Sequence, residues 1–309
     1  MDWTVSDQDR GARLDKFLAA ADRLGSRRRA SVALDRGKVF VNGVEAGADA
    51  AATRLRKGDR VRVWMDRPGS ARSRTPVRTG DLRILLEDDA IIVLDKPAGL
   101  LAVPLERKEN ADSVLAQLVT HLRPQGKRKP LVVHRIDRDT SGLVVFAKTA
   151  AAQRALREQF KRHDVERIYR AVVYGHPSPP SGVWRDRLVW DQRALIQKET
   201  HPRDPKGKDA VCRYETLERF ASTSLIEVRL ETGKRNQIRL QARLRGHTLV
   251  GETRYVFGPD ELRPIDFPRQ ALHAFRLVFA HPVTGRTMRF EAPMPGDFVA
   301  LVSRLRSSA

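Results

Sequence analysis

Several features common in other protein classes are missing from this chain of 309 residues. It has one cysteine, Cys212, so it can form neither an internal disulfide nor a cysteine-rich zinc site, and it suits a reducing cytosol. It has no run of about 20 apolar residues, so no helix is expected to cross a membrane. Its first residues are acidic and polar, which predicts no secretory signal. Together these absences favour a cytoplasmic protein.

Motifs of two large enzyme classes are also missing. The chain has no glycine-rich phosphate-binding loop of the Walker or Rossmann type, which argues against a nucleotide cofactor. It has no Gly-x-Ser-x-Gly elbow, which argues against a serine hydrolase.

Acidic residues are in the minority. The 58 lysines and arginines outnumber 38 aspartates and glutamates, which leaves a net charge of +20. Such an excess says little about the fold, but it indicates a polyanionic partner, and nucleic acid is the partner that it favours. The rival is an anionic membrane surface, for which no long basic amphipathic helix argues.

The N-terminal part of the chain has the pattern of a small α/β module. Apolar residues recur at helical spacing in residues 14–21, and Ser26 can cap a second helix. Residues 38–41 and 59–64 alternate as strands do, and the Asn-Gly pair at 42–43 is a strong hairpin signal. The sequence therefore predicts a self-contained module, assigned to residues 1–66.

Three arginines, Arg27, Arg28 and Arg29, open the second of these helices. A helix N-terminus already carries partial positive charge, so this placement is unfavourable unless an anion lies nearby. Phosphate groups of a nucleic acid are the expected anions. The alternative is a solvated basic face without a ligand.

A linker and a larger domain follow the module. Residues 67–80 are rich in proline, glycine, serine and arginine and are assigned as the linker. Residues 81–309 mix strands and helices without a regular repeat, which predicts an α+β domain with a mixed, largely antiparallel sheet. Helices are expected at 151–161, behind Thr149 as a cap, and at 236–244. Strands are expected at 84–86, 91–94, 143–146, 169–173, 225–230 and 277–279.

Between two apolar runs, residues 131–133 and 143–146, lies an unusually polar loop. Charge is costly beside a core unless it is paired or used, so the loop is either a tight turn or a site. Arg135 and Arg138 would repel a metal ion. An ionised aspartate beside arginines could instead act as a nucleophile or a base. The residue types alone leave these alternatives open.

Residues 134–143, His-Arg-Ile-Asp-Arg-Asp-Thr-Ser-Gly-Leu, resemble the signature of the RluA family of pseudouridine synthases. Four further blocks resemble that family in the same order: residues 95–104, 167–175, 232–240, and 272–274 with 281–282. The module resembles the small RNA-binding domain named after ribosomal protein S-four. Five blocks in order are far more specific than any one of them.

The resemblance implies an isomerase that converts uridine in RNA to pseudouridine. It implies a pseudouridine synthase fold with no cofactor and no metal, acting as a monomer on RNA and not at a membrane. Ribosomal RNA is the expected substrate, with transfer RNA as the alternative. The target base must leave its stack to be reached, which costs a few kcal/mol.

The resemblance also assigns the site residues. Asp137 would be the catalytic carboxylate, paired with Arg239, and Tyr169 would stack on the target base. Arg135 would fill the space that the flipped uridine leaves. The full set of expected substrate-binding residues is Arg135, His134, Thr140 and Ile238, with Arg27, Arg28 and Arg29 of the module.

Two residues of these blocks need separate treatment. Asp139 lies two residues from Asp137, and only the family pattern ranks them; a turn-stabilising role is expected for Asp139. The third block usually reads His-Gln-Ile-Arg, whereas this chain has Asn236 in place of the histidine. An asparagine can cap a helix or donate a hydrogen bond, but it cannot carry charge. Two rival functions remain, a non-catalytic RNA-binding or ribosome-assembly protein and a metal-dependent nuclease.

Overall fold

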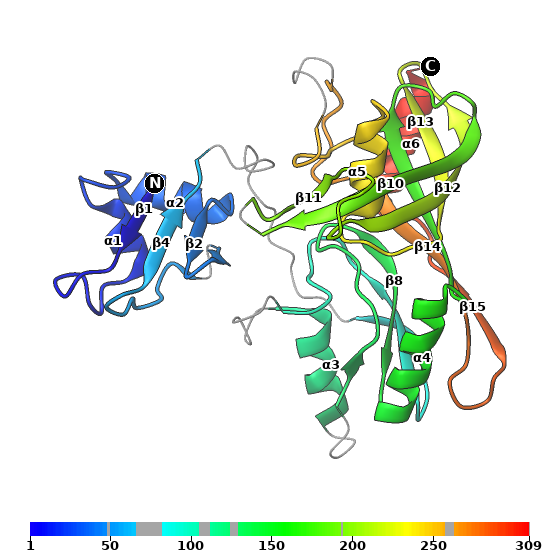
Figure 1. The fold of residues 1–309 in the computed structure, drawn as a ribbon, viewed down its shortest axis with the longest axis horizontal. Coiled ribbons are helices and arrows are strands. Elements are labelled where there is room, and N and C mark those ends of the chain that lie inside the picture. The colour runs from blue at the N-terminus through cyan, green and yellow to red at the C-terminus, as the bar shows by residue number, and fades with distance from the viewer. Residues whose placement is uncertain are drawn as a thin grey trace. The chain divides into compact units, whose positions relative to one another are not determined.

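The computed structural model describes residues 1–47, 50–65, 82–104, 112–123, 129–192, 194–256 and 263–308. These residues form two compact units, one up to residue 65 and one from residue 82 onward (Figure 1). The predicted linker, residues 67–80, lies outside the described residues, so the domain boundaries stay a prediction. Among the described residues, no helix is both long and apolar enough to cross a membrane.

The N-terminal unit packs two helices on a small sheet. Helices α1 (Leu14–Ala19) and α2 (Arg27–Asp35) share one apolar core with the sheet. Within the described residues the sheet has the strand order β1-β4-β2-β3, all antiparallel, and its strands are β1 (Asp2–Thr4), β2 (Val39–Val41), β3 (Val44–Ala46) and β4 (Arg60–Val63).

Local signals of the N-terminal unit are confirmed, with one difference. The hydroxyl of Ser26 accepts a hydrogen bond from the Arg29 backbone N–H at 3.2 Å and caps α2. The Asn-Gly pair at 42–43 has φ of 51° and 77° and makes the β2–β3 hairpin. Helix α1 ends at Ala19, earlier than the apolar spacing predicts, because Ala20 is extended and its carbonyl accepts hydrogen bonds in the turn to α2.

One large twisted sheet organises the second unit. Its described strands follow the order β11-β10-β12-β13-β9-β14-β8-β6-β5, with β15 added on β14 and β7 on β8. Only the β14–β8 pair among them is parallel. The strands are β5 (Arg83–Glu87), β6 (Ile91–Lys96), β7 (Leu131–Val132), β8 (Ser141–Ala147), β9 (Glu166–Tyr174), β10 (Ser181–Asp191), β11 (Ile196–Glu199), β12 (Lys208–Arg219), β13 (Thr223–Leu230), β14 (Leu272–Ala280) and β15 (Thr287–Glu291).

Helices cover both faces of this sheet (Figure 1). Helices α3 (Val114–Leu122) and α5 (Gln237–Leu244) share a core with one set of alternating strand residues, such as Ile92 and Val144. Helix α4 (Ala150–Arg162) packs on the opposite set, which includes Val93 and Val145, and α6 (Gly296–Ser307) packs on that face around Val172. Strands β6 and β8 lie between these layers, which explains why they are almost continuously apolar.

The predicted fold class is confirmed: the sheet is mixed and largely antiparallel, with helices interspersed. The expected strands at 84–86, 91–94, 143–146, 169–173, 225–230 and 277–279 all lie within strands of the structure. The hydroxyl of Thr149 accepts from the Ala152 backbone N–H at 3.1 Å and caps α4, as predicted. Strands β10 and β12 and helices α3 and α6 were not foreseen.

Candidate active site

The polar loop joins β7 to β8, and Asp137 opens the tight turn within it. Strands β7 and β8 pair antiparallel, with Val132 opposite Phe146, so the loop leaves the sheet beside the end of β8 and returns to its first residue, Ser141. The Thr140 backbone N–H donates to the Asp137 carbonyl at 3.2 Å and closes the turn. The Arg138 and Asp139 side chains pair with each other at 3.0 Å, which fits the turn-stabilising role expected for Asp139.

A buried lysine holds this turn from behind. Lys96, at the end of β6, has no exposed surface, and its ammonium donates at 2.8 Å to the carbonyls of Pro97, Leu100 and Arg138. Burial lowers the pKa of Lys96 to about 7. Three carbonyls match the three donors of an ammonium, so Lys96 ties the first block of the sequence to the turn that carries Asp137. The motif reading had given this lysine no role.

Asp137 meets two donors from the start of α5. The Arg239 Nη1 atom lies 3.0 Å from Asp137 Oδ2, which is the ion pair that the motif resemblance predicted across 102 residues. Asn236 Nδ2 donates to the same oxygen at 2.5 Å. Among the described residues Oδ1 has no hydrogen-bond partner, and the side chain keeps 22% of its surface exposed. One carboxylate oxygen is therefore fixed, and the other is free to meet a substrate.

Asn236 takes the second of the two roles considered for it. It sits at the N-cap position of α5 in the left-handed region, with φ of 53°, and its side chain makes no capping bond. Instead it donates to Asp137, while its Oδ1 accepts from the Tyr255 hydroxyl at 3.1 Å. Asparagine is among the residues that adopt this backbone conformation most readily.

Glu252 completes the pairing and was missed by the sequence reasoning. Its carboxylate binds Arg239 through two bonds of 2.6 and 2.7 Å and has no exposed surface. Burial opposes the charge of both groups. Their mutual attraction outweighs it, so the pKa of Glu252 is lowered and that of Arg239 raised. Arg239 therefore stays charged and oriented toward Asp137.

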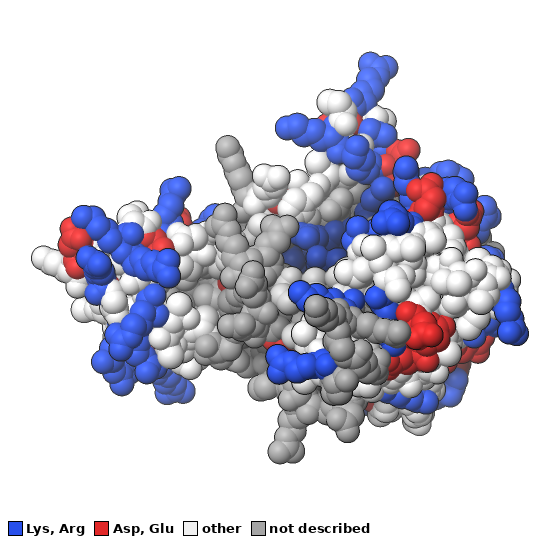
Figure 2. Space-filling model, turned by 90° about the horizontal axis from the view of Figure 1, so that it is seen from below, with Lys and Arg blue, Asp and Glu red and all other residues white. Residues whose placement is uncertain are grey.

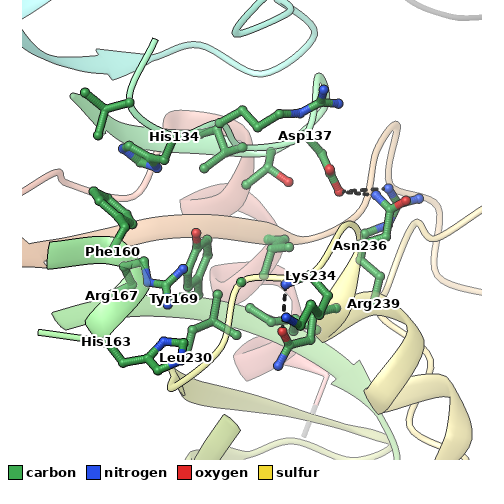
Figure 3. Close-up of a pocket in the computed structure, with 18 of the residues that line it drawn as sticks. His134, Asp137, Phe160, His163, Arg167, Tyr169, Leu230, Lys234, Asn236 and Arg239 are labelled. Atoms are coloured by element: carbon green, nitrogen blue, oxygen red, sulfur yellow. Dashed lines mark hydrogen bonds and ion pairs between the residues drawn. The ribbon is translucent and has the colours of Figure 1, made fainter. Parts of the chain in front are cut away.

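Asp137, Asn236 and Arg239 line a cavity of about 580 Å³, a volume typical of small-molecule and cofactor sites. Asp137, Asn236 and Arg239 lie at one end of it, and Phe160, His163 and Arg167 at the other (Figure 3). Tyr169, from the middle of β9, lies between the two ends. Burial raises the pKa of its hydroxyl, which keeps the ring neutral. An aromatic face beside a carboxylate suits a flat base attached to a sugar.

The other predicted substrate residues of this unit also line the cavity, but most are engaged with the protein. The His134 ring stacks on Phe160 at 4.6 Å and its Nε2 accepts the Val145 backbone N–H at 3.1 Å. Burial lowers the pKa of His134 to about 3, so the ring is neutral. Thr140 is 1% exposed and its hydroxyl accepts from Gln270, and Ile238 is 4% exposed in the apolar core.

The predicted arginines divide between the two units. Arg135 is exposed and lines the cavity, which leaves its guanidinium available to a ligand. Arg27, Arg28 and Arg29 are exposed on the first turn of α2, which holds no acidic residue. They belong to the N-terminal unit and do not line this cavity.

A buried serine–histidine pair nearby does not revive the hydrolase alternative. The Ser141 hydroxyl lies 2.9 Å from His273 Nδ1, and His273 Nε2 lies 3.0 Å from the Ala292 carbonyl. Both residues are at least 98% buried and neither lines the cavity, so no substrate can reach the hydroxyl. The pair joins β8 to β14.

Comparison with known proteins assigns this arrangement to a family. Residues 90–244 match the family model described as RNA pseudouridylate synthase. The RNA pseudouridine synthase YlyB of Bacillus subtilis is 36% identical over 312 residues, which cover 100% of this chain and 99% of the relative. The ribosomal large subunit pseudouridine synthase D of Zymomonas mobilis is 35% identical, over 99% of this chain and 97% of the relative.

Solved structures agree on the fold. Human RNA pseudouridylate synthase domain containing 4 superposes with a TM-score of 0.59 at 22% identity, over 72% of this chain and 93% of that one. The family model spans half of the chain, and the relatives match along its whole length. The chain therefore belongs to the RNA pseudouridylate synthase family, as its RluA-type blocks predicted.

Proposed function

We propose that this protein isomerises specific uridines of ribosomal RNA to pseudouridine, with Asp137 as the catalytic carboxylate. Membership of the family makes the protein an isomerase that acts on RNA. The ribosomal substrate is proposed because several full-length relatives are named ribosomal large subunit pseudouridine synthase D. Transfer RNA is the alternative substrate. We also propose that the protein acts in the cytoplasm and as a monomer.

The free Oδ1 atom of Asp137 is the observation that carries this proposal. Arg239 and Asn236 both donate hydrogen bonds to Oδ2 and hold the carboxylate in one orientation. Oδ1 can then attack the ribose or remove a ribose proton. The reaction exchanges a nitrogen–carbon for a carbon–carbon glycosidic bond within one nucleotide, so it needs no group from outside.

Tyr169 and Arg135 have separate proposed roles around the flipped uridine. The Tyr169 ring stacks on the base inside the cavity, and its neutral hydroxyl helps to move a proton at the ring. Arg135, exposed at the loop that carries Asp137, fills the place that the uridine leaves in its stack. Flipping costs a few kcal/mol, and these contacts offset it.

The N-terminal unit is proposed to be an S-four-type RNA-binding domain that strengthens RNA binding by electrostatic attraction. Lysine and arginine side chains cover much of the visible face of this unit (Figure 2). Arg27, Arg28 and Arg29 stand at a helix N-terminus with its orphan N–H groups, an arrangement that favours phosphate.

Mapping pseudouridines in cellular RNA tests the function directly. RNA from a strain without this gene is compared with RNA from the same strain carrying the wild-type gene or Asp137→Asn. We expect one or a few ribosomal sites to lose pseudouridine and to regain it only with the wild-type gene. Loss confined to transfer RNA would contradict the ribosomal substrate, and equal rescue by both genes would contradict the role of Asp137.

A further inference from the structure

Arg167, on β9, is a buried arginine without a counter-ion. Three arginines of the described chain are only 8% exposed: Arg167, Arg239 and Arg269. Arg239 pairs with Glu252 and Asp137, and Arg269 pairs with Asp297 at 2.7 Å. Arg167 has no carboxylate within ion-pair distance among the described residues. The protein thus neutralises two of these buried charges and leaves the third open.

The remaining contacts of Arg167 are weak for a buried guanidinium. Its Nη2 reaches the Glu231 carbonyl at 3.4 Å, and its Nε is buried without an acceptor. The Phe160 ring lies 5.5 Å away. Burial lowers the pKa of Arg167, which marks the charge as destabilised in the free protein. Leaving a charge buried and unpaired is costly, so an anion that reached this place would be bound with a large gain.

Arg167 faces the same cavity as Asp137, at the opposite end (Figure 3). Lys161, His163 and Lys234 line the cavity with it. Among the described lining residues Asp137 is the sole carboxylate, and it is already paired with Arg239. The potential at the Arg167 end is therefore positive, and no carboxylate among the described lining residues at that end neutralises it.

Gly233 makes room for this guanidinium. A Cβ atom at position 233 would lie 2.4 Å from Arg167 Nη1, closer than real side chains approach. The glycine lets the chain pass directly over the guanidinium and keep it at the cavity. The neighbour is the far end of a flexible side chain, so an alanine here would push Arg167 aside without disturbing the backbone.

We propose that the Arg167 end of the cavity binds a backbone phosphate next to the target uridine. This inference rests on the proposed function, because it takes RNA as the ligand. A flipped nucleotide brings its flanking phosphates toward the protein, and the planar fork of a guanidinium matches two phosphate oxygens. A uracil carbonyl could accept one of the hydrogen bonds, but only an anion neutralises the charge. Arg167 would fix the nucleotide's position, while Asp137 acts on its sugar.

The first experiment measures how RNA binding depends on salt, and it tests whether the charge of Arg167 contributes to that binding. Bulk ribosomal RNA is titrated with full-length Asp137→Asn protein, which rules out turnover, and with the same protein carrying Arg167→Gln, Arg167→Lys or Arg289→Gln. Arg289 is an exposed cation outside the cavity and serves as the control. We expect Arg167→Gln to weaken binding roughly 10- to 100-fold and to reduce the log–log salt slope by about 0.7. Arg167→Lys should keep the slope, because it keeps the charge. An Arg167→Gln slope equal to that of Arg289→Gln would overturn the proposal.

Replacing one charged linkage of the RNA by a neutral linkage identifies the phosphate that Arg167 binds. Short oligoribonucleotides around the mapped uridine carry a single uncharged methylphosphonate at one flanking position at a time. At one of these positions the methylphosphonate should weaken binding to protein that has Arg167. At the same position it should not weaken binding to the Arg167→Gln variant any further. Gly233→Ala should behave as Arg167→Gln does, although it removes no charge. If no flanking linkage is coupled to Arg167, the guanidinium binds the base and not a phosphate, and the proposal is wrong. Failure of the proposed function would show separately, because the wild-type protein would then form no pseudouridine in RNA without the neutral linkage.

Discussion

At the scale of single residues, the site depends on how Asp137, the one carboxylate among the described residues that line the cavity, is held. Asp137 is bound by two donors. One of them, Arg239, is itself bound by Glu252, whose side chain has no exposed surface. Glu252 also accepts the backbone N–H groups of Thr253, Arg254 and Tyr255 at 2.7 to 3.2 Å. Glu252 therefore orients Arg239, and Arg239 in turn orients Asp137.

Replacing Glu252 by glutamine should destabilise the protein and impair catalysis together. The substitution leaves the buried Arg239 charge with Asp137 as its remaining carboxylate, and breaking such a pair typically costs about 3–5 kcal/mol. Urea denaturation measures the loss of unfolding free energy. The control is Glu218→Gln, which removes an exposed partner of Arg306 and should cost about 1 kcal/mol or less. Equal losses for the two variants would refute the role assigned to Glu252.

The His134 ring should make the protein less stable in acid. Burial lowers its pKa to about 3, whereas the unfolded chain takes up the proton near 6.5. Between these values the unfolded state binds more protons, so stability is full above pH 6.5 and falls as the pH falls toward 3. Protonation would also remove the acceptor of the Val145 N–H. His134→Gln keeps an acceptor without titrating, so its urea midpoint should drop less than that of the wild type between pH 7 and 5. A parallel drop would show that His134 does not carry this dependence.

At the scale of elements, β8 is the strand that joins the loop carrying Asp137 to the rest of the sheet. Gly142 lies at its start with φ of 108°, and a Cβ atom there would lie 2.2 Å from the Ala274 carbonyl oxygen on β14. This close backbone approach makes the one parallel pair of the described sheet. Gly142 is needed both for its left-handed φ and for the contact.

Gly142→Ala should separate β8 from β14 and lower the melting temperature by several degrees or more. The added methyl group meets backbone, which cannot move aside as a side chain can. Thermal unfolding followed by circular dichroism measures the change. Gly285→Ala, at a turn with positive φ but open space around it, is the control and isolates the cost of φ alone. If the two variants melt together, the close approach is not what constrains position 142.

The contrast between fully buried and partly exposed strands explains which elements could be predicted from the sequence. Strands such as β6 and β8 are buried on both sides and read as apolar runs, and α4 combines a cap with an apolar stripe. Strands β10 and β12 carry many charges because part of each faces solvent, so local pattern did not distinguish them from loops. Their structure comes from pairing with each other and with β13, which is long-range information.

The residues of the site also divide into those that the sequence indicates and those that only the fold reveals. Asp137, Tyr169 and Arg239 lie in recognisable blocks, and the ion pair between Asp137 and Arg239 was expected from them. Glu252 lies outside these blocks, and Arg167 lies in the 167–175 block but was assigned no role there. Their importance comes from burial, and only the fold shows that Glu252 has a partner of opposite charge, whereas Arg167 has none among the described residues. Lys96 lies in the 95–104 block, but its three carbonyl acceptors are brought together by tertiary structure.

At the scale of the whole molecule, a net charge of +20 should make RNA binding strongly dependent on salt. If the protein contacts about 6–10 phosphates, its affinity should fall roughly 10³- to 10⁵-fold between 50 and 200 mM salt. Replacing Arg27, Arg28 and Arg29 with glutamine in the full chain should reduce the log–log slope by about 2 to 3, since each phosphate contact contributes about 0.7 to 0.9. Filter binding at several salt concentrations gives the slope. An unchanged slope would mean that the N-terminal unit does not grip the RNA backbone through these arginines.

The central claim is that the Asp137 carboxylate performs the isomerisation and does not merely help to bind RNA. The most direct measurement is single-turnover conversion of uridine to pseudouridine in the mapped RNA, with saturating wild-type or Asp137→Asn protein, together with the affinity of each for that RNA. Asparagine has nearly the same shape and loses only the charge and the nucleophilic oxygen. We predict that Asp137→Asn binds the RNA within about tenfold of the wild type and forms no detectable pseudouridine. Pseudouridine formed at the wild-type rate by Asp137→Asn would contradict the account.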